Sequence, residues 1–154
     1  MQAEPLCYVS NGDKGRPVET GNETSSQAET LAAAVVLVVD DELAILEMLG
    51  RLLTKRGYRV ETANSGEEAV ERIALGHDYD VILLDIFMPG QEGKATYEKI
   101  IGLRPDLTQR IIFITGDMTM PDTQVFLERT GASYVAKPFN LGELVATIQA
   151  ALGR

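Results

Sequence analysis

The sequence predicts a doubly wound α/β domain of the flavodoxin-like (βα)5 type, a single domain with a parallel sheet in the strand order 2-1-3-4-5. From residue 35 onward, five short apolar segments alternate with five helical patterns. Three of these segments are almost continuous Val, Ile and Leu, which is typical of strands covered by helices on both faces. Such an alternation favours a parallel sheet with right-handed crossovers.

The five strands are expected near residues 35–41, 58–63, 79–85, 110–116 and 133–138. The first helix is expected over 42–56, where Leu recurs at helical spacing, and the third over 93–103. Ser65 and Asn140 each precede a Glu by three residues, which is the pattern that begins a helix. Pro121 suits the first turn of the remaining helix, although its apolar pattern is weak.

Residues 1–33 differ from the rest of the chain, and we expect a disordered tail or a linker there. This stretch is rich in Gly, Ser, Thr, Asn and Glu and has no apolar period. The single domain is expected over residues 34–154. Cys7, in the tail, is the only cysteine, so the chain has neither an intrachain disulfide nor a thiol cluster for zinc.

Composition limits the classes of function. The formal net charge of −9 argues against non-specific binding to nucleic acid or to an anionic membrane. No apolar run approaches the ~20 residues of a membrane-spanning helix, and no signal peptide is apparent. We therefore expect no membrane segment in this chain, no nucleic-acid partner and a cytoplasmic location.

Polar residues gather where the predicted strands end, which is the edge of a doubly wound sheet that carries its working site. Asp40 and Asp41 end the first strand, Asp85 the third, Thr115 the fourth and Lys137 the fifth. Carboxylates so close together need a positive partner, and oxygen ligands select Mg²⁺ or a similar ion such as Mn²⁺. A lysine suits a phosphoryl group, so the set suggests an aspartate that accepts one.

The motifs "VVDDE", "DVILLDIFMPGQEG", "FITG" and "YVAKPF" resemble those of the two-component response-regulator receiver domain, over roughly residues 35–152. The resemblance implies that Asp85 is the phosphoacceptor and that Asp40 and Asp41 serve Mg²⁺. It also implies that the backbone carbonyl of Phe87 is a further metal ligand.

By the same resemblance, Lys137 forms a salt bridge with the phosphoryl group and Thr115 hydrogen-bonds it. Tyr134 matches the aromatic switch residue that turns inward together with Thr115 on activation. The Lys137–Pro138 bond is expected to be cis.

Plainer interpretations compete for several of these residues. Asp40 and Asp41 are also suited to capping the helix that follows, and Asp85 to beginning a turn before Pro89. Lys137 would then be an ordinary surface lysine. His77, the only histidine, is expected in a surface loop.

Phe87 departs from the pattern of the receiver family, in which this position varies and often carries a polar residue. We hypothesise that Phe87 limits the approach of water to the acyl phosphate and slows its hydrolysis; Asp117 is a weaker candidate for the same effect. Phe87 also stands where a phosphoaspartate hydrolase would need a second acid, which argues against that class.

The expected function is that of a phosphoacceptor module in a two-component or phosphorelay system, not an enzyme beyond its own phosphorylation and slow dephosphorylation. Since the chain lacks a plausible histidine donor, the phosphoryl group would come from a histidine kinase, a histidine phosphotransfer protein or a small molecule. The alternative is a pseudo-receiver that binds partners without phosphorylation. The domain could be a free-standing regulator or the C-terminal receiver of a hybrid histidine kinase, with output through an unknown protein effector.

Overall fold

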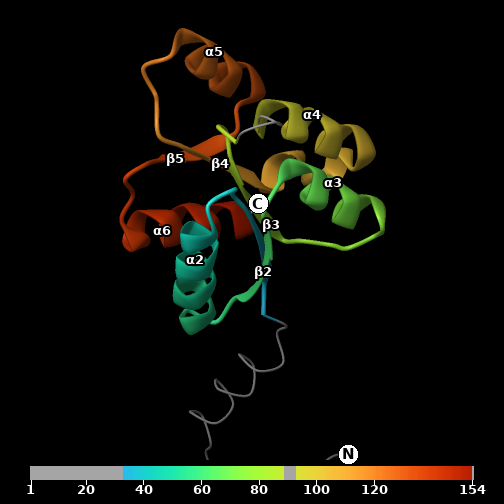
Figure 1. Cartoon of the computed structure of the whole chain (residues 1–154), viewed down its shortest axis with the longest axis vertical. Helices are drawn as coiled ribbons and strands as arrows, with labels where there is room; N and C mark the ends of the chain where they lie inside the picture. The colour runs from blue at the N-terminus through green and yellow to red at the C-terminus, as the bar shows by residue number, and fades with distance from the viewer. Residues whose placement is uncertain (1–32, 89–92, 154) are drawn as a thin grey trace, which may run out of the picture. The chain divides into compact units, whose positions relative to one another are not determined.

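A computed structural model of the chain describes residues 33–88 and 93–153 (Figure 1). The tail predicted for residues 1–33 lies outside the described residues, apart from Ala33. Among the helices of the described part, none has both the length and the apolar character that crossing a membrane requires.

The centre of the fold is a five-stranded parallel sheet in the order β2-β1-β3-β4-β5, as predicted. The strands are β1 (Val35–Val39), β2 (Arg59–Ala63), β3 (Val81–Asp85), β4 (Ile111–Thr115) and β5 (Ser133–Ala136). β1 and β3 are neighbours, and from them the chain continues toward opposite edges of the sheet. Such a switch point leaves space for a site beyond the carboxyl ends of the two strands.

Helices cover both faces of the sheet (Figure 1). One core packs β-strand side chains against α2 (Leu43–Lys55) and α6 (Leu141–Leu152). The other packs them against α3 (Gly66–Ala74), α4 (Gly93–Leu103) and α5 (Pro121–Thr130). Covering both faces removes the apolar side chains of the central strands from water, which is the main stabilisation of the fold.

Burial of the strands explains their composition. Every residue of β3 and β4 is buried, and so is all of β1 except Val35, whereas the edge strands β2 and β5 are mostly half-buried. The three segments of almost continuous Val, Ile and Leu are therefore the three central strands. The more polar segments form the edges, where one side meets solvent.

Two helices begin with the predicted side-chain caps. The Glu68 N–H donates to Ser65 Oγ at 3.1 Å, and the Glu143 N–H donates to Asn140 Oδ1 at 2.7 Å. In the first case the Glu68 carboxylate also accepts from the Asn64 N–H at 2.9 Å. The reciprocal bond of the capping box thus reaches one residue further back than the usual pattern.

The structure differs from the sequence prediction in detail. Each strand is shorter than predicted, so Asp40, Asp41, Gly116, Lys137 and Pro138 lie in loops after their strands. A short 3-10 helix, η1 (Pro105–Arg110), precedes β4 and was not predicted. The sequence feature that could have indicated this helix is the proline in its first turn. In the structure the fully buried Leu107 packs it against the core.

Candidate functional site

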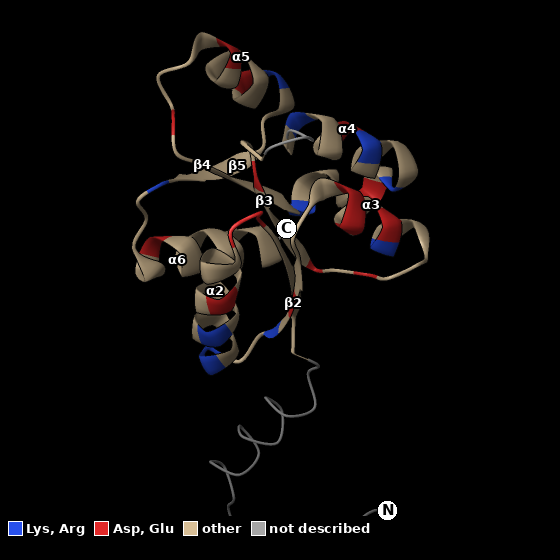
Figure 2. Ribbon diagram, in the orientation of Figure 1, with Lys and Arg blue, Asp and Glu red and all other residues tan. Residues whose placement is uncertain are grey.

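The ends of β1 and β3 bring two buried acids together. Val39 is in register with Leu84, so Asp40 and Asp85, one residue further along each strand, are neighbours. Figure 2 shows the acidic residues at these two strand ends in red. Asp40 is 1 % exposed and Asp85 4 % exposed. Two carboxylates so deeply buried need compensating partners.

Each of these acids uses its two oxygens in the same way. Asp40 Oδ1 accepts from the Glu42 N–H at 2.9 Å, and Asp85 Oδ1 accepts from the Phe87 N–H at 3.2 Å. Bonds to the backbone two residues on are typical of aspartate at a turn. They leave Oδ2 of both carboxylates directed to a shared partner.

That partner is Lys137. Its Nζ lies 3.3 Å from Asp40 Oδ2 and 3.4 Å from Asp85 Oδ2. The backbone N–H of Lys137 donates to the Thr115 carbonyl at 2.7 Å, which ties the loop after β5 to the end of β4. The Lys137–Pro138 bond is cis, as predicted. The interpretation of Lys137 as an unattached surface lysine is therefore wrong.

Burial and neighbouring charge act on this group of residues in opposite directions. Burial raises the pKa of Asp85 from 3.8 to about 6, Lys137 lowers it in part, and Asp40 raises it. Burial by itself would lower the pKa of Lys137, but the charges of Asp85 and Asp40 raise it overall. Asp85 is thus a carboxylate at neutral pH whose ionisation is opposed by its surroundings.

Asp41 completes an acidic cluster beside the two buried residues. One carboxylate oxygen each from Asp40, Asp41 and Asp85 lies within 4.8 Å of the others, and Asp41 is exposed. Three hard oxygen donors this close together, one of them on an exposed residue, suit a small divalent cation that keeps some of its waters. The N-cap of α2 is Glu42, so neither Asp40 nor Asp41 is the capping residue, although Asp40 Oδ1 accepts from the Glu42 N–H.

The other predicted residues occupy different surroundings. Thr115 is fully buried at the end of β4, and its Oγ accepts from the Asp117 N–H at 3.3 Å. Tyr134 is 46 % exposed and lines a cavity of about 370 Å³ beside α5, so its side chain is outside the acidic cluster. Phe87 is 37 % exposed and lies two residues beyond Asp85, the last residue of β3. His77 is exposed, as expected.

Gly93 is a residue of the site that sequence reasoning missed. Its N–H donates to the Ile86 carbonyl at 2.7 Å, joining the start of α4 to the chain just after β3. A Cβ on Gly93 would overlap the carbonyl oxygen of Asp85 and lie 2.7 Å from the Cα of Ile86. The absent side chain lets α4 begin directly against the backbone of Asp85.

The fold and the site define a class: an α/β protein with a carboxylate cluster and a lysine at the switch point of a parallel sheet. The family of the response regulator receiver domain matches residues 36–149, and the chain belongs to this family. The transcriptional regulatory protein KdpE of Mycobacterium tuberculosis is 38 % identical over 120 residues, 78 % of this chain and 51 % of KdpE.

Solved structures of receiver domains are also similar to this chain. A CheY-like receiver domain protein of Methanospirillum hungatei is 33 % identical, with a TM-score of 0.71 over 79 % of this chain and 94 % of that one. The response regulator TrrA of Thermotoga maritima, solved in complex with Mg²⁺-BeF, is 32 % identical with a TM-score of 0.66. The match to TrrA covers 77 % of this chain and 99 % of that one. The chain spans about half the length of curated relatives such as KdpE.

Proposed function

We propose that the domain accepts a phosphoryl group on Asp85 from a partner histidine kinase or histidine phosphotransfer protein and thereby switches a protein-binding surface. The observation that carries this proposal is the pairing of Asp85 with Lys137 beside Asp40 and Asp41. Membership of the receiver family supports the same reaction.

In the proposed reaction, a carboxylate oxygen of Asp85 attacks the phosphorus of a phosphohistidine. The new O–P bond makes an acyl phosphate as the N–P bond breaks, and the electron pair leaves with the imidazole nitrogen. Asp85 enters as the carboxylate, which its pKa of about 6 allows at neutral pH. Positive groups held in the buried site stabilise the charge that develops on the transferred phosphoryl group.

The surrounding residues would stabilise the charge of the phosphoryl group. Lys137 already contacts Asp85 Oδ2, so its ammonium needs little movement to meet a phosphoryl oxygen. Thr115 follows Ile114, the register partner of Asp85 on β4, and would offer its hydroxyl as a donor. Asp40, Asp41 and the carbonyl of Phe87 would hold Mg²⁺ or Mn²⁺, which neutralises phosphoryl charge when it is bound.

The wider role follows from this reaction. We propose that the domain is not an enzyme toward other substrates and that it catalyses only its own phosphorylation and slow dephosphorylation. Its partners would be a phosphodonor protein in the cytoplasm and a downstream protein effector. Tyr134 is the proposed aromatic switch, and its exposed side chain is what an inactive state would present.

The test is to incubate the protein with Mg²⁺ and acetyl phosphate and to measure the intact mass. We expect the mass of one phosphoryl group to be gained by the wild type and by Asp78→Asn, whose carboxylate is exposed and precedes the end of β3 opposite to Asp85. We expect no gain in Asp85→Asn. A folded wild-type protein that gains no mass would contradict the proposal and favour the pseudo-receiver alternative.

Phe87 carries a separate prediction about the lifetime of the phosphoryl group. We expect Phe87→Asn to lose phosphate several-fold faster than the wild type, because a polar side chain beside Asp85 admits and orients water. The measurement is the decay of the phosphorylated mass after the donor is removed. Phe87→Leu, which keeps an apolar side chain, is the control and should decay at the wild-type rate. An unchanged decay in Phe87→Asn would refute the shielding hypothesis.

A further inference from the structure

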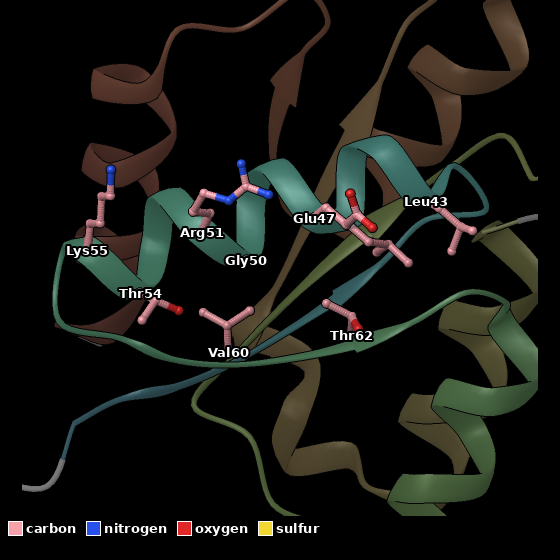
Figure 3. A pocket seen from close by; sticks show the side chains of 9 residues that line it. Leu43, Glu47, Gly50, Arg51, Thr54, Lys55, Val60 and Thr62 are labelled. Atoms are coloured by element: carbon pink, nitrogen blue, oxygen red, sulfur yellow. The ribbon is translucent and has the colours of Figure 1, made fainter.

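A surface separate from the acidic cluster lies between α2 and the edge strand β2, at the edge of the sheet opposite to β5. A groove of about 830 Å³ runs between them; Val60 of β2 lies opposite Thr54 of α2, and Thr62 lies opposite the part of α2 that carries Glu47 (Figure 3). Gly50 of α2 also lines the groove, and a Cβ placed there would meet nothing within 4 Å. The groove therefore has room for the side chains of another segment.

The backbone of β2 has an open edge beside this groove. The Arg59 N–H donates to Ala34 and the Ala63 carbonyl accepts from Asp40, so the odd-numbered residues of β2 pair toward β1. Since direction alternates along a strand, Val60 and Thr62 turn their N–H and C=O groups outward. Within the described part of the chain nothing pairs with this edge. Such an edge is a template for an added strand.

The groove is also bordered by an unusual concentration of positive charge. Residues 48–60 contain Arg51, Lys55, Arg56 and Arg59, four of the 14 basic residues, and none of the 23 acidic ones. All four side chains are exposed, and none forms an ion pair within the described residues. Figure 2 shows this blue stretch at the end of α2 and the start of β2.

Two of the cations belong to the groove itself. Arg51 and Lys55 are among its lining residues, and in Figure 3 their side chains extend from α2 on the side away from Val60 and Thr62. Because no ion pair within the described residues holds them, they can turn toward a carboxylate in the groove. Glu47, one turn earlier on α2, lines the other end and would repel acid there. The groove thus has a positive end and a negative end.

We propose that the α2–β2 groove binds an extended acidic segment of a partner protein, which adds to the sheet beside β2. Its backbone pairs with Val60 and Thr62, and its carboxylates meet Arg51 and Lys55. A short segment fits better than a polyanion such as nucleic acid, because the chain outside this basic stretch is strongly acidic and would repel a longer anion. The proposal concerns the unphosphorylated protein and does not depend on Asp85.

The first experiment uses an acetylated and amidated octapeptide in which Val alternates with Glu, and a counterpart in which Val alternates with Lys. Each is titrated into the full chain, and the backbone amide signals are followed by NMR. We expect the Glu peptide to shift the amides of Val60 and Thr62 and to bind at least tenfold more tightly than the Lys peptide. Equal binding of both peptides, or shifts confined to other surfaces, would overturn the proposal.

Variants of the protein separate the two parts of the proposal. Arg51→Glu with Lys55→Glu should weaken binding of the Glu peptide at least tenfold, while Lys99→Glu, an exposed change on α4, should alter it less than twofold. Gly50→Leu should block the groove. Gly102→Leu is its matched control, since Gly102 is also a helical glycine with no atom near its Cβ position.

The peptide can test strand addition directly. N-methyl groups on alternate residues remove the hydrogen-bond donors from one edge of the peptide at a time. We expect one methylated set to abolish binding and the other to preserve it, because only one edge faces β2. If both sets bind like the parent peptide, or if no peptide binds at millimolar concentration, the proposal is wrong. The basic residues would then serve only to protect the sheet edge and the end of α2.

Discussion

Replacing Gly93 with Ala is expected to lower the free energy of unfolding by about 3 kcal/mol, the upper range for forcing extra atoms into a packed site. The new methyl group would overlap the Asp85 carbonyl oxygen and lie against the Cα of Ile86. These are backbone atoms at the buried end of β3, so no side chain can turn away to make room. Either α4 or the end of β3 must move.

Gly102→Ala is the matched control for this change. Gly102 lies in the same helix, and a Cβ there meets nothing within 4 Å. Because alanine favours a helix over glycine by about 1 kcal/mol, we expect this variant to be slightly more stable than the wild type. The measurement is urea denaturation of all three proteins. If both substitutions changed the free energy of unfolding equally, helix propensity and not the contact with the Asp85 backbone would explain the effect at Gly93.

Replacing Asp85 with Asn is expected to stabilise the metal-free protein by about 3 kcal/mol above pH 7. Burial raises the pKa of Asp85 from 3.8 to about 6. Each pKa unit corresponds to about 1.4 kcal/mol of free energy. Asn has nearly the shape of aspartate and can accept the same bond from the Phe87 N–H, but it carries no charge to bury.

The stability difference between the wild type and Asp85→Asn is expected to depend on pH. Well below pH 3.8 aspartate is protonated whether folded or unfolded, so Asp85 and its Asn replacement should be nearly equal in stability. Between about pH 4 and pH 6 the folded state keeps a proton that the unfolded chain has lost, so the wild type loses stability as pH rises through its folded pKa. Above about pH 7 the difference should be constant.

The measurement is the midpoint of urea denaturation at pH 4 and pH 8 in the presence of EDTA. Adding Mg²⁺ at pH 8 should stabilise the wild type more than Asp85→Asn, because one carboxylate of the cluster is then missing. A variant that is less stable than the wild type at pH 8 would contradict the prediction. It would mean that the attraction between Lys137 and Asp85 outweighs the cost of burial.

Much of the site could be predicted because its residues are tied to strand ends. A strand of continuous apolar residues can be recognised from its composition. The residue that follows it must then lie at the carboxyl end of that strand. Asp40, Asp85 and Lys137 could therefore be placed at one edge by sequence reasoning, and in the folded chain they are in contact. The helix starts at Ser65 and Asn140 were predictable for a similar reason, since capping is a local interaction.

Other features depend on contacts between segments that are distant in the sequence. Nothing near Gly93 indicates that its Cβ would collide with Asp85, because the close approach is set by how α4 packs against β3. The outward exposure of Tyr134 likewise depends on the packing of α5 beside β5. The groove between α2 and β2 exists because the helix leaves the edge strand partly uncovered.

The sequence alone determined the order of elements, the parallel sheet and the identity of the acids and the lysine at its carboxyl edge. These follow from hydrophobic period, turn residues and caps, which act over a few neighbouring residues. The tertiary structure decided which oxygen of each acid faces Lys137, how burial shifts the pKa of Asp85, and why residue 93 has no side chain. Those properties depend on distances between segments, and only packing sets such distances.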